Sequence, residues 1–364
     1  MKKTLVALSV LAAAANVNAG EIYATDASKV SLTGGIDAFV VQSDIEKSQV
    51  RDEKDANVVT FGKVQLDAEH KLNADLTVMG SFEIESSSGA VDGTDNKAVF
   101  DDMYVGIKAD SWTVAVGEVG DVADSTDAIE KGDITNEGKF FGHAGGHRSE
   151  SKGNGIVLKA DLADNLVFVA DVHTVSDKDV ENTIGASLDW AINDMFSIGG
   201  SFVSGEQAKD VDYRVGGVAA SMTAGGFMVA ATYTQFEGVN SFGLFGSKSK
   251  SGTTEIDYDY MNGDAYGVAL QYTIDKTRLY ATYDVMGLDE KTVGGADANG
   301  DTTNLVVGVE YSVMDNLKVF TEYQTADTSN DFDGATGTNK DGVSLPSGKG
   351  LDADVYLVGA YYTF

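Results

Sequence analysis

The sequence predicts an all-β fold, namely a transmembrane antiparallel β-barrel of about 16 strands. Three observations predict it. Apolar and polar residues alternate with a period of two, short turns alternate with long polar loops, and no stretch after residue 19 is apolar enough for a spanning helix. A barrel of this size is too wide to be filled by its own side chains, so we expect one strand face to line water and the other to contact lipid.

The first residues have the features of a secretory signal peptide. Lys2 and Lys3 give a positive start, residues 4–15 form a short apolar stretch, and Ala19 ends a cleavage site of small residues. A spanning helix is the alternative, but it needs roughly 20 apolar residues, which this stretch does not supply. We therefore expect residues 1–19 to be cleaved and residues 20–364 to form one barrel domain.

The alternation is clear in individual segments. Leu32, Ile36 and Val40 share one parity, whereas Thr33 and Asp37 take the other. Residues 76–84, 279–285 and 305–311 repeat the pattern. Because successive side chains of a strand point to opposite faces, each segment is predicted to be a strand with one apolar and one polar face.

The connections alternate in length. The seven short turns, expected on the periplasmic side, fall at residues 70–75, 110–111, 163–165, 193–194, 224–225, 275–276 and 314–316. The eight longer loops, expected outside the cell, cover residues 43–56, 87–97, 119–152, 176–179, 206–210, 237–259, 287–301 and 326–352. A soluble β-sandwich also alternates, but it does not show this rhythm of connections. Together the connections imply an even number of strands, as bacterial outer-membrane barrels have.

Composition excludes several classes of function. Acidic residues outnumber basic ones 57 to 26, which gives a formal charge of -31 and argues against a nucleic-acid partner. The chain has no cysteine, so disulfides, thiolate metal sites and a cysteine nucleophile are excluded. Hydrophobic residues still make up 43%, too many for an acidic disordered chain.

The last strand carries an alternating stripe that ends on an aromatic residue. Its members are Tyr356, Val358, Ala360, Tyr362 and Phe364. Aromatic side chains at this position suit the interfacial girdle of a membrane barrel. With the segments VSLTGGIDAFV and DDMYVGIKADSWTVAVGE, this strand resembles those of the Gram-negative general-diffusion porin family, and the acidic character is most similar to the OmpU-type porins of vibrio-like marine bacteria.

The resemblance implies a homotrimer in the outer membrane, with an inward-folded third loop that narrows each pore. It also implies that the stripe ending at Phe364 is part of the signal read by the barrel-assembly machinery. Two departures are visible. Gly117-Glu118 stands where many members have a glycine-arginine pair, and the third loop lacks their proline, since Pro346 is the only proline.

Charged residues of the third loop, residues 119–152, are candidates for the narrowest part of the pore. Asp121, Asp124, Asp127 and Glu130 follow one another at a spacing of three, which predicts one side of a short helix capped by Asp124 or Ser125. The second half is basic, with Lys139, His143, His147, Arg148 and Lys152. Charged rings at a constriction select ions. The alternative is that these acids decorate a solvated loop.

On the barrel wall, parity places Lys63, Glu83, Arg278 and Tyr280 toward the lumen. Lys63, Arg148 and Arg278 are candidates for a positive side that faces the acids, although each could instead be a partner in a salt bridge of the wall. The predicted constriction residues are Glu118, Asp121, Asp124, Asp127, Glu130, Lys63, Arg148 and Arg278.

The leading functional hypothesis is passive diffusion of ions and small hydrophilic solutes, with a preference for cations because fixed negative charge concentrates counter-ions. A substrate-specific channel and a surface adhesion protein are the alternatives. No cofactor is expected, and no enzyme, because the four histidines form no recognisable catalytic set. His143 and His147 are separated by Ala-Gly-Gly, which disfavours a metal site. Divalent cations could bridge the acidic surface to lipopolysaccharide phosphates and so tie the protein to membrane lipids.

Overall fold

The computed structural model describes residues 20–47, 50–86, 98–143, 154–239, 248–251, 254–257, 261–288, 300–328 and 351–364. The predicted signal peptide, residues 1–19, lies outside this part of the chain and stays a prediction. Within the described residues the only helix is a single 3-10 turn, η1 (Asp127–Ile129). No helix in that part is long and apolar enough to cross a membrane.

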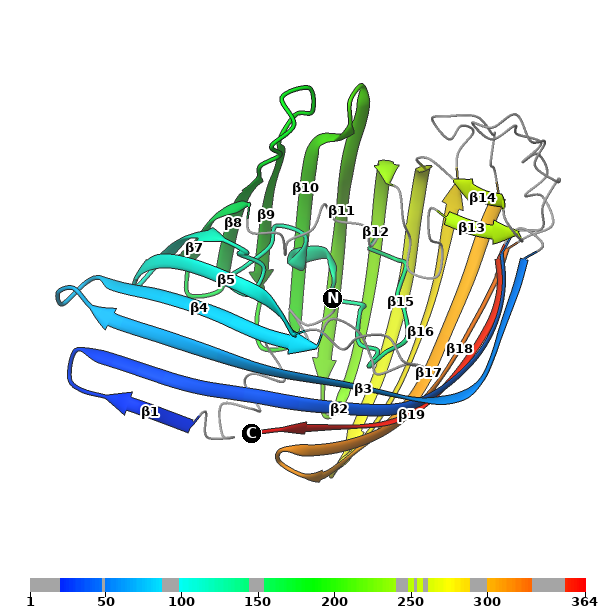
Figure 1. The fold of residues 1–364 in the computed structure, drawn as a ribbon, viewed down its shortest axis with the longest axis horizontal. Helices are drawn as coiled ribbons and strands as arrows, with labels where there is room; N and C mark the ends of the chain where they lie inside the picture. Colours follow the sequence, from blue (N-terminus) through cyan, green and yellow to red (C-terminus); the bar gives the residue numbers. More distant parts are fainter. Residues whose placement is uncertain are drawn as a thin grey trace.

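Sixteen long strands form a closed antiparallel barrel, as predicted, and each pairs with the next along the chain (Figure 1). They are β2 (Ser28–Lys47), β3 (Val50–Lys71), β4 (Thr77–Ser86), β5 (Ala98–Ala109), β6 (Trp112–Gly117), β7 (Gly155–Ala163), β8 (Leu166–His173), β9 (Thr183–Ala191), β10 (Phe196–Ala208), β11 (Val211–Ala224), β12 (Phe227–Val239), β15 (Met261–Ile274), β16 (Thr277–Leu288), β17 (Gly300–Met314), β18 (Leu317–Thr328) and β19 (Leu351–Thr363). A separate ribbon is formed by β13 (Lys248–Ser251) and β14 (Thr254–Asp257).

The barrel closes where the last strand meets the first long one. β19 pairs with β2 from Leu351↔Lys47 to Thr363↔Gly35, and Phe364 then exchanges two backbone hydrogen bonds of 2.9 Å with Gly34. The short strand β1 (Gly20–Ala24) pairs with β2 beyond this point, beginning at Gly20↔Leu32. Closure pairs the two end strands of the barrel with each other. A membrane requires this, because lipid offers unpaired backbone groups no hydrogen bonds.

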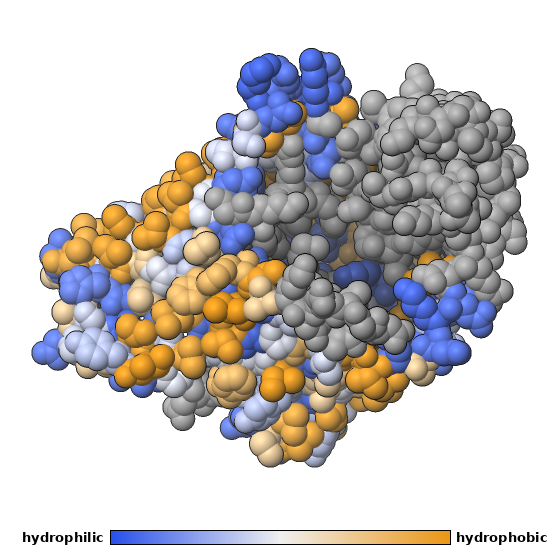
Figure 2. Space-filling model, in the orientation of Figure 1, coloured by the Kyte–Doolittle hydropathy of each residue, from blue (hydrophilic) through white to orange (hydrophobic). Residues whose placement is uncertain are grey.

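The two faces of the wall carry the polarity that the alternation predicts. Apolar side chains point outward and are exposed, among them Phe100 and Val358, which is 61% exposed. Polar side chains such as Glu83 and Asp284 point inward and are buried. Figure 2 shows apolar residues spread over the outer face of the strands, with hydrophilic residues at the tip of the β10–β11 connection. This inversion of an ordinary soluble protein is what a lipid-facing barrel requires.

The first predicted loop, residues 43–56, is mostly strand. β2 and β3 continue through it in register, with Ser43 opposite Lys54 and Lys47 opposite Val50. The loop predicted at residues 206–210 is likewise shorter than expected. β10 leads directly into β11 through a turn at Asp210, whose φ is 60°. Beyond the membrane both faces of a strand meet water, so alternation of apolar and polar residues no longer separates strand from loop.

The C-terminal stripe lies on the outer face, where Tyr356, Val358, Tyr362 and Phe364 are exposed. The Phe364 ring covers Gly34, since a Cβ there would stand 2.6 Å from Phe364 Cζ.

We expect Phe364→Ala to lower the amount of folded barrel in outer membranes by several-fold, because it removes this ring at the closing seam. Heat-modifiable migration on gels measures the folded fraction. Tyr311→Ala, on the outer face of β17, is the matched control. Equal losses in the two variants would contradict a special role for the terminal residue.

Candidate pore constriction

The third loop enters the barrel through a turn that requires glycine. Gly117 ends β6 with φ of 131°, and a Cβ there would lie 2.3 Å from Met103 O. Glu118 follows and pairs with the backbone of Met103, as its N–H donates to Met103 O at 2.9 Å and its Oε2 accepts from Met103 N at 3.0 Å. Opposite this turn, Asp102 has φ of 49° within an irregularity of the β4–β5 register. Glu118 therefore supplies the hydrogen bonds that this bulge in β5 would otherwise lack.

The first limb of the loop runs over the inner faces of β6 to β12. Val119 and Ala123 pack on Ala115, Val157 and Val169. Further on, Lys131 Nζ binds both carboxylate oxygens of Asp189 on β9 at 2.8 Å. Gly199 on β10 leaves room for the loop, because a Cβ there would stand 2.0 Å from Ala128 O. The limb is thus packed against the wall and not suspended in the lumen.

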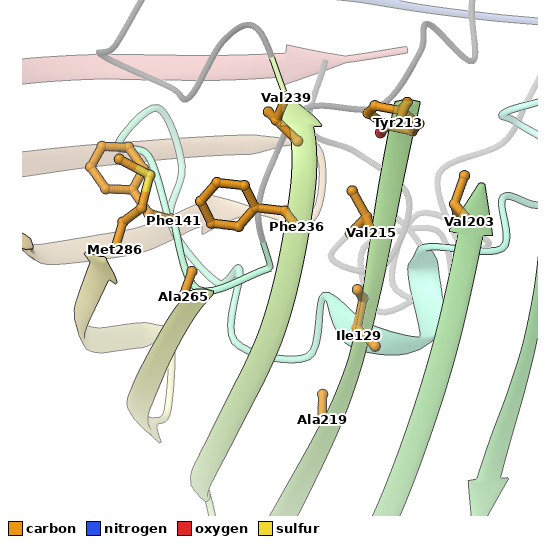
Figure 3. Close-up of a cluster of buried hydrophobic side chains, with 10 residues drawn as sticks. All are labelled: Ile129, Phe141, Val203, Tyr213, Val215, Ala219, Phe236, Val239, Ala265 and Met286. Carbon is orange, nitrogen blue, oxygen red and sulfur yellow. The ribbon is translucent and has the colours of Figure 1, made fainter. Parts of the chain in front are cut away.

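An apolar cluster fixes the middle of the loop. Figure 3 shows Ile129 and Phe141 of the loop facing the strands. The wall side of the cluster consists of Val203, Tyr213, Val215, Ala219, Phe236, Val239, Ala265 and Met286. Apolar side chains are uncommon on the lumen face of a water-filled barrel, and here they coincide with the area that the loop covers. Burial of this area from water stabilises the inward position of the loop.

The tip of the loop is held by one carboxylate. Glu322 on β18 accepts hydrogen bonds from the backbone N–H groups of Asn136 at 2.5 Å, Glu137 at 2.8 Å and Gly138 at 2.8 Å. Tyr280 Oη donates a further bond to it at 2.8 Å. Successive N–H groups around one anion form a strong, charge-assisted arrangement. We call these four contacts the Glu322 anchor.

The returning limb is bound by polar side chains of β16 to β18. Phe141 N donates to Asp284 Oδ1 at 3.0 Å, and Asn304 Nδ2 donates to Lys139 O at 2.7 Å. Gln324 exchanges two bonds with the backbone of Lys139, at 3.1 and 3.2 Å. The described part of the loop, residues 119–143, therefore makes most of its contacts with the lumen face from β6 to β19, and reaches β3 to β5 only near its start.

The four acids at a spacing of three do not form the predicted row. Only Asp127–Ile129 is helical, as one 3-10 turn whose preceding residue, Thr126, makes no capping hydrogen bond with its side chain. Asp124 is buried and accepts hydrogen bonds from Thr126 N and Oγ1, both at 2.8 Å. Asp127 Oδ2 accepts from Asp124 N at 3.1 Å. The expected helix is missing because these side chains bind nearby backbone and so favour a turn.

Glu130 and His143 connect the two limbs. Glu130 Oε1 lies 3.9 Å from His143 Nδ1, and Asp133 Oδ2 lies 3.5 Å from His143 Nε2. Both carboxylates are largely covered. Glu130 is thus placed within the loop structure, between its limbs, and its predicted part in ion selection stays a prediction.

Arg278 points inward, as its parity predicts, but it is occupied by the loop and the wall. Its guanidinium donates to Ile134 O and Asn136 Oδ1, each at 2.7 Å, and to Glu310 Oε2 at 3.0 Å. It also stacks over the Tyr280 ring, 4.2 Å from the centroid. Arg278 therefore anchors the loop, while Arg148 lies outside the described residues.

Asp121 is the loop acid that faces the wall formed by β3 to β5. Its Oδ2 accepts a hydrogen bond from Gln65 Nε2 at 3.2 Å, and its side chain is exposed to the lumen. Lys63 on β3 lies close by and forms a 2.6 Å ion pair with Glu83 on β4. The carboxylates gathered here, which we call the acidic patch, are Asp67, Glu83, Asp101, Asp102 and Asp121.

The surroundings of Asp121 alter its ionisation. Although its carboxylate meets water in the lumen, barrel atoms on most sides reduce its solvation, and this desolvation raises the pKa of Asp121 above its ordinary value. Lys63 opposes the rise, and the negative charges of Glu83 and Asp67 add to it. The negative charges around Asp121 therefore disfavour its ionised form.

Sequence reasoning named Lys63 and Asp121 as candidates, and both lie at the acidic patch, but it did not single out Asp101, Asp102, Glu322 or Asp284. For Glu322 and Asp284, inward parity on their strands was an available signal. For Asp102 there was none, because the bulge at that residue changes the parity of β5. Tyr280, which parity placed toward the lumen, points inward but is buried in the Glu322 anchor.

The Glu322 anchor is open to a direct test. In Glu322→Gln one acceptor oxygen becomes an NH₂ group, so at least one buried N–H loses its acceptor, at a cost of about 1–3 kcal/mol. We expect a lower urea midpoint for unfolding from detergent micelles and noisier single-channel current. Asp327→Asn, at an exposed acid on the same strand, is the control. Identical midpoints in both variants would show that the anchor contributes no stability.

Known proteins with similar sequences and folds agree with this architecture. Residues 6–331 match the Gram-negative porin family. Porin-like protein H of Photobacterium profundum is 25% identical over 91% of this chain and 96% of its own length, and outer membrane porin C of Salmonella typhimurium is 24% identical over 97% of each. Among solved structures, OmpT of Vibrio cholerae superposes with a TM-score of 0.65 at 19% identity, covering 95% of this chain and all of that one.

Salmonella typhi OmpF, solved in complex with daunomycin, gives a TM-score of 0.66 at 18% identity, over 94% of this chain and 100% of that one. The family match and the curated relatives point to a channel rather than an enzyme, while the finer similarity to OmpU-type porins stays a prediction. From the family match and the closed barrel together, the chain belongs to the Gram-negative porin family and is a β-barrel protein of the outer membrane.

Proposed function

We propose that the chain forms a water-filled pore for passive diffusion of ions and small hydrophilic solutes, and that this pore prefers cations. The observation that supports the preference is the acidic patch on the wall of β3 to β5, which the third loop contacts only near its start. A path past this wall meets carboxylates from both the strands and the loop.

Two of the three basic residues expected to oppose these acids already have carboxylate partners. Lys63 pairs with Glu83, and Arg278 pairs with Glu310 and the loop backbone. Four carboxylates of the patch then remain beside one lysine that is already in an ion pair. Acidic rings in a narrow passage attract cations and repel anions. Screening acts over roughly 10 Å at 0.1 M salt, so these nearby charges outweigh the distant surface acids.

Asp121→Asn should reduce the cation preference, because it removes the one loop carboxylate that belongs to the patch. The measurement is the reversal potential of the reconstituted protein in a planar bilayer under a salt gradient. Asp194→Asn changes the same charge at an exposed turn and should leave the potential near the parent value. The triple change of Asp121, Asp124 and Asp127 to Asn should add little to the single change. A reversal potential unaffected by Asp121→Asn would contradict the proposed role.

The pH dependence gives a second readout of the same variant. The pKa of Asp121 is raised, so this carboxyl takes up its proton at a higher pH than an ordinary aspartate as the solution is acidified. Cation preference in the parent should therefore begin to fall before unperturbed carboxylates titrate, and Asp121→Asn should lack this first step. If cation preference depends on pH in the same way in the parent and in Asp121→Asn, its loss on acidification comes from other acids.

We also propose a homotrimer inserted by the barrel-assembly machinery, which would read the stripe at Tyr356, Val358, Ala360, Tyr362 and Phe364. OmpT of Vibrio cholerae, solved in a trimer form, superposes with a TM-score of 0.64 and 19% identity, covering 93% of this chain and 100% of that one. Lipopolysaccharide phosphates bridged by divalent cations to surface acids are further proposed contacts.

The trimer makes a prediction of its own. Light scattering of the detergent-solubilised protein, corrected for bound detergent, should give three times the mass of one chain, and unheated gel samples should migrate as the same species. In bilayers, conductance should appear in groups of three equal steps. Single steps and a monomer mass would contradict the proposal without affecting the fold.

A further inference from the structure

We propose that Asp124, Asp171 and His173 form a binding site for a divalent transition-metal ion of the zinc type, buried between the start of the third loop and the wall. One ligand atom from each residue lies within 4.8 Å of the others, and all three residues are buried. The site lies at the loop end of β8, away from the acidic patch, so it stands independently of the proposed ion preference.

The chain brings these residues together in two ways. Asp171 and His173 are two apart on β8, so both point into the barrel. Asp124 arrives from the loop, and its neighbour Ser125 fastens the loop there by donating its backbone N–H to Asp171 Oδ2 at 2.6 Å. No spacing along the sequence signals such a site, because one ligand comes from a loop 47 residues upstream of the strand pair.

In each carboxylate, one oxygen accepts hydrogen bonds from loop residues, and the other lies toward the cluster. Asp124 Oδ1 accepts from Thr126 N and Oγ1, whereas Asp124 Oδ2 lies 3.8 Å from His173 Nε2. Asp171 Oδ2 accepts from Ser125 N, and Asp171 Oδ1 makes no hydrogen bond within the described residues. Buried polar atoms are almost always paired, so an oxygen of this kind indicates an additional ligand.

Ser125 lies in the same space. It is 0% exposed, and its hydroxyl is close to the Asp171 carboxylate, although among the described residues it has no partner at full hydrogen-bond geometry. Gly185 on β9 keeps this space open, since a Cβ there would stand 2.0 Å from Ser125 Oγ and 2.3 Å from Asp171 Oδ1. Any larger residue would fill the place where these oxygens converge.

The donor set decides the class of ion. Calcium and magnesium take oxygen ligands, whereas an imidazole nitrogen beside two carboxylates suits zinc and similar ions. Donors around a tetrahedral zinc stand roughly 3.3 Å apart, given bonds of about 2.0–2.1 Å. The 3.8 Å from Asp124 to His173 is near this spacing, and small side-chain rotations would close the cluster. Water could take a fourth position, within reach of the Ser125 hydroxyl.

Such an ion would join the loop to β8 through Asp124 and the wall ligands. Two carboxylates buried beside one imidazole carry net negative charge, which is costly away from water. A divalent cation offsets that charge and links the two segments. The ion would thus hold the start of the third loop against β8.

The test is zinc binding to the full mature chain folded in detergent. The protein is dialysed against Zn²⁺ with Mg²⁺ in excess, so that Mg²⁺ occupies the surface carboxylates. Elemental analysis should then find about one tightly bound Zn²⁺ per chain. Asp171→Asn and His173→Gln should each lose that ion and the rise in thermal unfolding temperature that accompanies it. Asp189→Asn, which removes another carboxylate that binds the loop but has no histidine beside it, should keep both.

Three outcomes would overturn the site. The parent could retain no zinc, the folded Asp171→Asn and His173→Gln variants could bind as much as the parent, or Asp189→Asn could lose as much as they do. If the ligand variants do not fold, X-ray absorption of the zinc-loaded parent decides. One imidazole nitrogen and oxygen neighbours at about 2.0–2.1 Å support the site, and an all-oxygen shell overturns it.

Discussion

The pairing of backbone groups shapes this protein at two levels. In the wall, lipid provides no hydrogen bonds, so each strand pairs with its neighbours and β19 closes on β2. The third loop faces the same demand once it lies inside the barrel against the strands. Between residues 119 and 143 it has no regular structure beyond one 3-10 turn, so many of its amides and carbonyls there are paired by side chains of the wall.

This demand explains why so many polar residues are buried on the inner face. Glu322, Asp284 and Asn304 act as partners for a segment that lacks a partner strand. Arg278 contributes in the same way from β16, by binding Ile134 O. Inward polar positions thus serve two purposes, and parity alone does not separate them. Some line the water, and others complete the loop.

The fold was largely predictable from the sequence because alternation and loop length follow from the geometry of a barrel in a membrane. The outward stripe of Tyr356, Val358 and Tyr362 is an example. The local structure of the loop was not predictable in the same way. A spacing of three suggested a helix for Asp121 to Glu130, but Asp124 and Asp127 bind nearby backbone and separate the four side chains. Glu118 was expected at the constriction, yet it binds the bulge at Met103, which only the register of β4 and β5 reveals.

The residues that hold the third loop and the residues of the acidic patch lie mainly on different strands. This division bears on how such a protein can change over generations. Residues that hold the third loop lie mainly on β8 to β18, whereas the acidic patch lies mainly on β3 to β5. Under the role proposed for the patch, a lineage can therefore exchange charges at Asp67 or Asp101 and alter which ions enter, while the residues that hold the loop are inherited unchanged. Selection on the charges of the patch and selection on the stability of the barrel therefore act on separate sets of residues, and one need not oppose the other.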